Sequence, residues 1–479
     1  MMCGSHSPVP GRMPTMPSRA PRRTTALLWI ALLAACGPSP TPVDTGVSAP
    51  ERFARTGAEP PSARWWTDFG ATALDSLVDS ALESNLDVRT ARERIREADA
   101  VLGIESARRL PSLDATATGE LREGEGFVFG EEMSLGLRSS YELDLFGAVD
   151  ASVEADRFRA AAVRADLRAV EHVVAAEVAS TWCRVVEARS QVDLLRRQEE
   201  TNVAVLELLG ARFGSGRIRS VDVLRQRQLV ESTRERIHEA EGRLRTSEHA
   251  LAVLLGRPAG SAMATGTVEL PALPPLPATG VPAALVERRP DVRRAWFDVQ
   301  AADRDLATAI RERYPRIDLT ASITTTASEP SGLFEDWIAR LAGDLLAPIF
   351  RGGALRAEVE RTDAVRAQRL FDYVQAVLEA FREVEDALVL EQKQSERIRS
   401  LDRQIELAVQ SYEQLRSQYL NGLGGYLDVL TALTETQELR RARLAVQRAR
   451  LETRIALYRA LAGPIHDPRV PDAQEGQSR

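Results

Sequence analysis

The sequence from Pro111 to Phe146 reads PSLDATATGELREGEGFVFGEEMSLGLRSSYELDLF. Apolar and polar residues alternate over its first part and again over its last part, on either side of a break rich in glycine and glutamate. A period of two is typical of β-strands, so we expect strands at 111–122 and 132–146. Two strands of roughly ten residues, with one apolar and one charged face, suit a membrane hairpin. A hairpin in a soluble sandwich has the same pattern.

The same alternation recurs in the second half of the chain, at 315–326 and at 337–349. The sequence therefore predicts four strands. Four strands cannot close a barrel, because about eight are needed to enclose even a packed interior. Open sheet edges are not tolerated in lipid, so if these strands enter a membrane, several copies of the chain must share one barrel.

A long helical stretch follows each pair of strands. The absence of proline over 148–257 and a cluster of glycines predict a helical hairpin with its turn at 212–220. A second hairpin is expected over 353–463, with its turn at 419–426. The first arm, about 60 residues, is roughly 90–100 Å long and must project or pair with neighbouring helices. Its partner arm has a heptad seam, which predicts a left-handed coiled coil, at Val223, Val230, Ile237, Leu244 and Leu251.

The chain contains two repeats. Asp291-Val292-Arg293 repeats Asp87-Val88-Arg89, and in each repeat we expect a helix before the strands, in the first over 75–109. The expected segments are repeat 1 at 71–257, a proline-rich linker at 258–282, repeat 2 at 283–463 and a disordered tail at 464–479. The predicted fold class is mainly helical with membrane β-strands. Three copies would supply twelve strands for one barrel with an open lumen, continued by a tube of paired helical arms.

The N-terminal region predicts a signal peptide at 1–35. A short apolar run ends in Leu33-Ala34-Ala35-Cys36, and small residues before a cysteine resemble the bacterial lipoprotein signal. We therefore expect a lipid on Cys36, followed by a tether over 36–70. The alternative is an ordinary cleavage site with an incidental cysteine. Gly37 follows the cysteine where an aspartate would retain such a lipoprotein at the inner membrane, which is compatible with the outer membrane.

Composition argues against several other classes of protein. The formal charge of −7 over 479 residues argues against nucleic acid as a partner. No apolar run reaches the roughly 18 residues of a transmembrane helix. Once Cys3 is removed and Cys36 is lipidated, Cys183 has no cysteine in the chain to pair with. The sequence has no metal-ligand spacing, phosphate loop or catalytic triad signature, so we expect neither an enzyme nor a cofactor beyond the lipid.

Over nearly all of the mature chain, the sequence resembles the outer membrane channels of bacterial tripartite efflux pumps. These are the TolC-like outer membrane factors, and the resemblance is to their lipoprotein branch. Each motif is weak by itself, but their order and spacing are specific. The motifs are Trp65-Trp66-x-x-Phe69, Tyr141-Glu142-Leu143-Asp144-Leu145-Phe146-Gly147, Leu254-Leu255-Gly256, Arg289-Pro290-Asp291-Val292, Pro348-Ile349-Phe350, and Phe381 before Glu383-Val384-Glu385-Asp386.

The resemblance implies a homotrimer with a β-barrel in the outer membrane and an α-helical tunnel in the periplasm. It also implies docking to a periplasmic adaptor and to an inner-membrane transporter of the RND type. The channel would be a passive duct whose periplasmic end is closed at rest and opens by untwisting of the inner helix pairs.

The family's gate lies beside the two helix turns. Matching by position places Asp222 and Tyr419 where a hydrogen bond between carboxylate and phenol joins the inner and outer arms, and Asp428 where one acid per protomer rings the constriction. An arginine of the family's latch falls at Gly424 and a second acid of its ring falls at Thr431, so another residue, Arg219 or Arg416, could hold this gate. Capping of the helix that follows each turn is the alternative role of both aspartates.

The two turns also supply the expected docking site for the adaptor. Its residues are Gly216, Ile218, Arg219, Ser220, Gly422, Leu423 and Gly424. A tight turn that requires a positive φ explains the glycines equally well. For the whole protein, the alternatives are a duct for type I protein secretion or for metal-ion efflux and, from another class, a coiled-coil lipoprotein that acts as a structural spacer.

Overall fold

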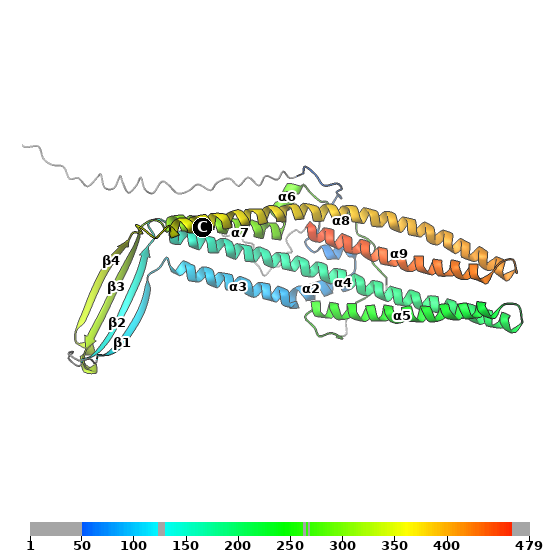
Figure 1. The fold of residues 1–479 in the computed structure, drawn as a ribbon, viewed down its shortest axis with the longest axis horizontal. Coiled ribbons are helices and arrows are strands. Elements are labelled where there is room, and N and C mark those ends of the chain that lie inside the picture. The colour runs from blue at the N-terminus through cyan, green and yellow to red at the C-terminus, as the bar shows by residue number, and fades with distance from the viewer. Residues whose placement is uncertain (1–49, 123–129, 262–264, 267–268, 462–479) are drawn as a thin grey trace, which may run out of the picture. The chain divides into compact units, whose positions relative to one another are not determined.

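The structure, a computed structural model, describes residues 50–122, 130–261, 265–266 and 269–461, which belong to one compact unit. The predicted signal peptide at 1–35, Cys36 and the tail at 464–479 lie outside these residues. The described chain is mainly helical and has one sheet of four strands (Figure 1). Among the described helices, none is both long and apolar enough to cross a membrane.

The four strands form one antiparallel sheet in the order of the sequence. They are β1 (Ser112–Arg122), β2 (Gly130–Leu143), β3 (Arg316–Ala327) and β4 (Trp337–Leu346). The register aligns the apolar residues of all four strands in rows, such as Ala115, Leu137, Ile323 and Ala339. Leu341 is 81% exposed, and many other residues of the apolar face are exposed as well, while Thr325, near the end of β3, is buried. The alternation of apolar and polar residues in the sequence therefore corresponds to the two faces of the sheet.

Two strands end earlier than the ranges 132–146 and 337–349 predict. Strand β4 ends at Leu346 because the nearby Pro348 has no backbone N–H to donate to a strand ladder. Strand β2 ends at Leu143, and the carboxylate of Asp144 accepts a hydrogen bond from the backbone N–H of Asp150 at 2.8 Å. Asp144 thus satisfies a free N–H in the first turn of the next helix.

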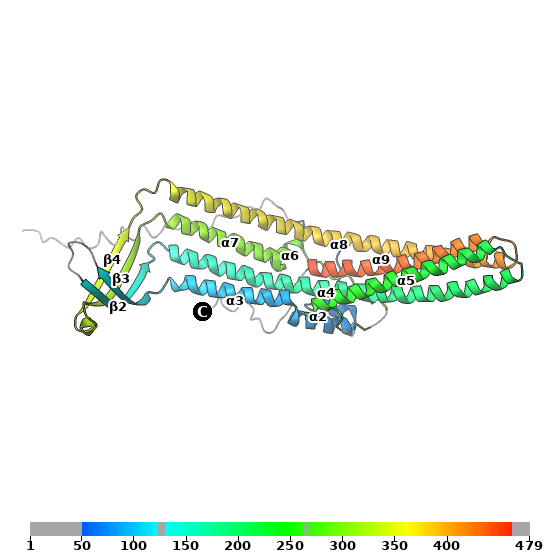
Figure 2. The ribbon, with the colours of Figure 1, turned by 60° about the horizontal axis from the view of Figure 1, so that its bottom comes forward.

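Each repeat joins its strands to long helices. The first contains η1 (Trp65–Phe69), α2 (Thr72–Ser84), α3 (Leu86–Ala107), α4 (Ala148–Gly214) and α5 (Ser220–Leu254). The second contains α6 (Pro282–Arg288), α7 (Pro290–Arg311), η2 (Pro330–Phe334), α8 (Ala354–Leu420) and α9 (Tyr426–Ala460). Helices α3, α4, α7 and α8 lie side by side in the same order as the strands that they continue (Figure 2).

The single helix predicted over 75–109 is wrong, because Asn85 divides it into α2 and α3. Asn85 has an extended backbone with ψ of 134°, and its side-chain oxygen accepts from the backbone N–H groups of Asp87 at 2.8 Å and Val88 at 3.3 Å. This is the geometry of a helix N-cap. Its side-chain nitrogen donates to the backbone oxygen of Leu254 at 2.9 Å, which also fixes the break against α5.

The described part of the tether predicted at 36–70 is packed against the helices. Phe53 is buried against Phe381 of α8, with 6.4 Å between the ring centroids. The three aromatic residues of η1 are buried as well: Trp65, Trp66 and Phe69. Aromatic side chains bury large apolar areas, so even this short stretch packs firmly against the core.

A buried arginine connects the linker to the second hairpin. Arg454 of α9 is 1% exposed and makes two hydrogen bonds to the carboxylate of Glu391 on α8, at 2.7 and 2.8 Å. It also donates to the backbone oxygens of Pro274 and, at 2.6 Å, Pro275. The described part of the linker is thus tied to α8 and α9 through one guanidinium.

Replacement of this arginine tests its role. Arg454→Met should lower the apparent melting temperature of the detergent-extracted protein, because an unpaired buried carboxylate at Glu391 costs about 3–5 kcal/mol. Arg459→Met is the matched control, since Arg459 is 42% exposed and lies 3.5 Å from Glu383. Equal melting temperatures for the two variants would contradict this account.

Candidate functional site: the helix turns and the seam between the hairpins

The two turns between the long helices have the same backbone geometry. Gly216 and Gly422 adopt the left-handed conformation, with φ of 71° and 76°. The next residue in each turn donates to a carbonyl five residues back, Arg217 to Arg212 at 3.0 Å and Leu423 to Gln418 at 2.8 Å. Glycine is favoured at a positive φ, so the helix ends by themselves explain these two residues.

An apolar cluster, which we call the tip cluster, joins the four helices beside the turns. Leu209 of α4 and the two α9 residues Tyr426 and Val429 are buried at its centre. Partly buried residues surround them: Val205, Ile218, Val223, Tyr412, Leu415, Tyr419 and Leu430. The two hairpins therefore meet through apolar contacts next to their turns.

The structure brings Asp222 and Tyr419 into one neighbourhood without the hydrogen bond expected between them. Asp222 is 5% exposed and lies 3.7 Å from the guanidinium of Arg219. The Tyr419 hydroxyl is buried and has no hydrogen-bond partner in the described part of the chain, while Arg212 lies 5.0 Å from its ring centroid. The pKa of Tyr419 is raised, chiefly by burial. The positive charge of Arg212 offsets part of this effect, and the negative charge of Asp222 adds to it. The Asp222 carboxylate therefore pairs with the guanidinium of Arg219 and makes no hydrogen bond to the hydroxyl of Tyr419.

Asp428 occupies the place in the second turn that Asp222 occupies in the first. Each is an acidic residue in the first turn of its helix, α9 or α5. Asp428 is exposed, whereas Asp222 is buried. The helix dipole stabilises an acidic residue at a helix N-terminus. The position of Asp428 is therefore explained equally well by this local stabilisation and by the predicted ring of negative charge.

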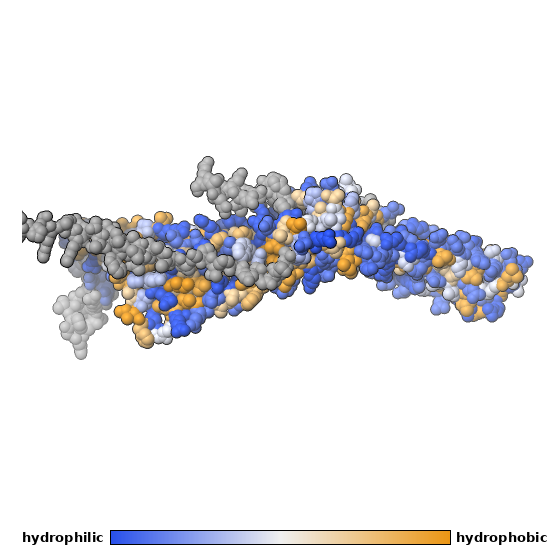
Figure 3. Space-filling model, turned by 90° about the horizontal axis from the view of Figure 1, so that it is seen from above, coloured by the Kyte–Doolittle hydropathy of each residue, from blue (hydrophilic) through white to orange (hydrophobic). Residues whose placement is uncertain are grey.

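The predicted docking residues lie on the surface of the two turns. Gly216, Arg219, Ser220, Gly422 and Gly424 are exposed, Leu423 is 80% exposed, and Ile218 is half-buried in the tip cluster. Further exposed apolar residues lie in the adjoining helix ends: Leu208, Phe213, Val221, Leu224, Leu420 and Leu427. Figure 3 shows hydrophobic residues gathered at the end of the molecule that carries the turns.

Sequence reasoning missed a hydrogen bond that joins the hairpins. Tyr426, the first residue of α9, donates its hydroxyl to the side-chain oxygen of Gln226 on α5, and Gln226 has no exposed surface. Burial raises the pKa of Tyr426 above the range of a free phenol. The sequence did contain a signal for this bond. Gln226 comes three residues after the seam residue Val223, so it is a polar residue at the other core position of the heptad, where it needs a hydrogen-bond partner.

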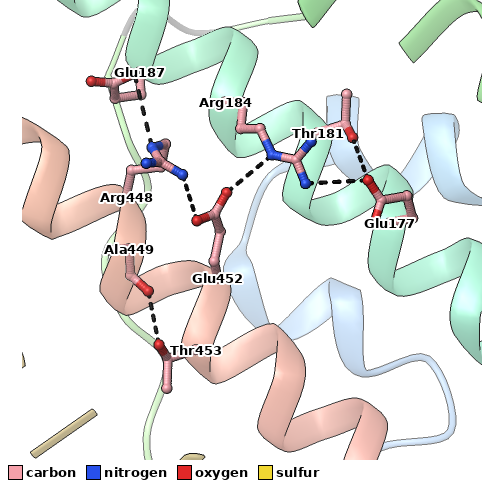
Figure 4. A network of polar contacts seen from close by, with 8 residues as sticks. All are labelled: Glu177, Thr181, Arg184, Glu187, Arg448, Ala449, Glu452 and Thr453. Carbon is pink, nitrogen blue, oxygen red and sulfur yellow. Dashed lines mark hydrogen bonds and ion pairs between the residues drawn. The ribbon is translucent and has the colours of Figure 1, made fainter. Parts of the chain in front are cut away.

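Away from the turns, α4 and α9 are joined by charged groups (Figure 4). Arg184 of α4 lies 3.2 Å from Glu452 of α9, and Arg448 of α9 lies 3.9 Å from Glu187 of α4. Arg184 also contacts Glu177 of its own helix at 3.2 Å. Across the described residues, no group of three or more histidine, cysteine or acidic side chains could hold a metal ion.

A family model described as "Outer membrane efflux protein" matches the chain at 77–257 and again at 281–463. The chain belongs to this family. The two matched segments correspond to the two halves of the fold, each with two strands and a long helical hairpin. The resemblance to outer membrane factors is therefore confirmed, and so is the expected function class of an outer membrane efflux channel.

Curated relatives and solved structures agree with this assignment. The chain is 31% identical to the pyoverdine export outer membrane protein OpmQ of Pseudomonas aeruginosa, over 90% of this chain and 94% of that protein. It is 28% identical to the cation efflux system protein CusC of Escherichia coli K12, over 84% and 89%. The open-state outer membrane channel MtrE of Neisseria gonorrhoeae superposes with a TM-score of 0.81 at 26% identity, over 89% and 98%. The predicted fold class is confirmed.

Two tyrosines near the turns provide a matched test of the site. Tyr426→Phe should lower the apparent melting temperature in detergent, because the buried oxygen of Gln226 loses its donor, at a cost of about 1–3 kcal/mol. Tyr419→Phe should leave it unchanged or raise it slightly, since the Tyr419 hydroxyl is unpaired among the described residues. The reverse order would mean that Tyr419 makes the stabilising hydrogen bond.

Proposed function

We propose that three copies of this chain form a passive exit duct for small molecules, as the outer membrane component of a tripartite efflux pump. The observation that carries the proposal is the four-stranded sheet with two unpaired edges. Within the described residues, β1 and β4 each pair on one side only. Pairing of β4 with β1 of the next copy removes every edge, and twelve strands leave an open lumen.

The helices at the two sides of the same layer support a closed ring. Helix α3 leads into β1, and α8 follows β4, so the two helices also lie at opposite edges of the molecule (Figure 2). Both carry large apolar residues on exposed positions: Leu86, Val101 and Ile104 on α3, and Phe371, Leu378, Val389 and Leu407 on α8. Contact between α8 of one copy and α3 of the next would bury the residues of α3 together with Phe371 and Leu378, because α3 covers only about the first 33 Å of α8 at 1.5 Å per residue.

The exposed apolar surface of the turns supports a protein partner at that end. We propose that a periplasmic adaptor docks there and connects the duct to an inner-membrane RND transporter, which supplies the energy. Small residues such as Gly422 and Gly424 allow a partner helix to approach closely, and Leu423 offers apolar area. At the same end, three copies of Asp428 would concentrate negative charge, which attracts cations and repels anions.

The cargo that we propose is a drug or another small molecule chosen by the transporter. Relatives of this chain are named for pyoverdine export, cation efflux and solvent efflux, so one channel architecture serves chemically different cargo. Metal-ion efflux and type I protein secretion remain alternatives for the same duct. A coiled-coil spacer has no use for a sheet with an exposed apolar face.

The mass of the detergent-extracted protein tests the assembly. We expect three chains per particle, measured by analytical ultracentrifugation with correction for bound detergent, because three four-stranded sheets are needed to close the barrel. A monomer or dimer would contradict the shared barrel and favour the spacer.

The proposed lipid anchor has a separate test. Mass spectrometry of the mature protein should find an acylated cysteine at position 36 as the N-terminus. Cys36→Ser should abolish acylation and leave the trimer intact, because the barrel rather than the lipid would hold the chains in the membrane. An unmodified N-terminus elsewhere would identify an ordinary cleavage site.

A further inference from the structure

Asn202 of α4 is the centre of a buried cluster of polar side chains between the two hairpins. It has no exposed surface and lies twelve residues before Gly214, where α4 ends. Its side-chain nitrogen donates to the hydroxyl of Thr233 on α5 at 2.9 Å. Its side-chain oxygen accepts from the amide of Gln437 on α9, also at 2.9 Å. One asparagine therefore connects three helices.

The backbone of the same residue extends these connections toward the turns. The side-chain nitrogen of Gln226 on α5 donates to the backbone oxygen of Asn202 at 2.6 Å. The side-chain oxygen of Gln226 accepts from the hydroxyl of Tyr426 at the start of α9. These groups are 5% exposed or less. We call Asn202, Gln226, Thr233, Tyr426 and Gln437 the amide cluster.

Apolar side chains lie on both sides of the amide cluster along α4. Val192 and Leu195 belong to a buried apolar group on the side away from the turns, and Leu209 belongs to the tip cluster on the other side. Hydrogen bonds in such surroundings are strong and directional, and losing one partner leaves a buried polar group unpaired. Polar groups at core positions of helical bundles also set the register between helices.

The contacts on the two sides of the cluster differ in kind from the cluster itself. Tyr426 belongs to both clusters, but the other side chains of the tip cluster make apolar contacts that are not directional, so they can repack when helices shift. The charged pairs between Arg184, Glu452, Arg448 and Glu187 are partly exposed, with 42% exposure at Arg184, so water can replace them at little cost. The amide cluster cannot rearrange without leaving buried polar groups unpaired, and the neighbouring Gln198 of α4, 5% exposed, adds bonds to the backbone oxygen of Gln437 and to Arg441 of α9.

We propose that Asn202 is a positioning residue that sets how far the two hairpins separate when the duct opens. The inference rests on the proposed function, since it concerns the opening of that duct. From Asn202 to the end of α4 is about 18 Å at 1.5 Å per residue. The amide cluster limits separation of the two hairpins to this segment of α4, where they contact each other through the tip cluster. Without the amide cluster, separation spreads along α4 and α9 toward the sheet.

The test is the resting conductance of the purified full-length protein in a planar lipid bilayer. Asn202→Leu should raise it about two- to tenfold, because separation of the hairpins can then spread beyond Asn202 and a hydrogen bond of ordinary net strength no longer opposes that spreading. Gln191→Leu is the matched control on the same helix, because its amide donates to the backbone oxygen of Arg441 on one partner helix at 3.1 Å, farther from the turns. The control should conduct as the wild type does.

A double variant separates positioning from general loss of stability. Asn202→Leu combined with Gln437→Leu removes both partners of one hydrogen bond, so the melting temperature should return toward that of the wild type. The conductance should stay raised, because the bond between the side chains of Asn202 and Gln437 is still missing, while the bonds of Gln198 on α4 to the backbone oxygen of Gln437 and to Arg441 are the same as in the wild type. Conductance that returns together with stability, or an Asn202→Leu channel that conducts like the wild type, would overturn the proposal.

The wild-type measurement distinguishes this inference from the proposed function. Absence of any conductance from a trimeric wild-type protein would overturn the duct itself, and the role of Asn202 with it. Conductance from the wild type with no difference between Asn202→Leu and Gln191→Leu would leave the duct standing and overturn the role of Asn202 alone.

Discussion

The unpaired backbone at the two edges of the sheet is the constraint on which the architecture of this chain depends. A strand that ends a sheet leaves N–H and C=O groups without partners, and lipid supplies none. In the described chain both edges and most of the apolar face of the sheet are left open. The helices continue the strands in the same order, with α3 next to the edge strand β1 and α8 next to the edge strand β4. A partner that pairs with the edge strands would therefore also lie beside α3 and α8.

The connection between the two hairpins combines three kinds of interaction with different tolerance for movement. Apolar packing joins them beside the turns, buried hydrogen bonds centred on Asn202 join them farther along, and partly exposed ion pairs join them beyond that point. Buried polar groups fix one register because their alternatives are unpaired. Apolar contacts and surface charges accept several arrangements. A seam that is firm in one place and adaptable in another suits a bundle whose end must change shape.

Much of the fold could be predicted because its signals are periodic and local. Alternation over 112–122 and 316–327 identifies strands, and Gly216 and Gly422 identify turns that require a positive φ. Other features were missed because they depend on partners distant in sequence. Asn85 ends one helix and caps the next while it binds the end of α5, and Phe53 packs on a residue more than three hundred positions later.

The sequence by itself determined the two repeats, the four strands and the long hairpins, because each follows from spacing between neighbouring residues. Only the tertiary structure decided which polar groups meet inside the bundle. Asp222 and Tyr419 come near one another without a hydrogen bond, whereas Gln226 and Tyr426, 200 positions apart, form one. The direction of a side chain within a bundle depends on how helices from both repeats pack, and no local pattern in either repeat records that packing.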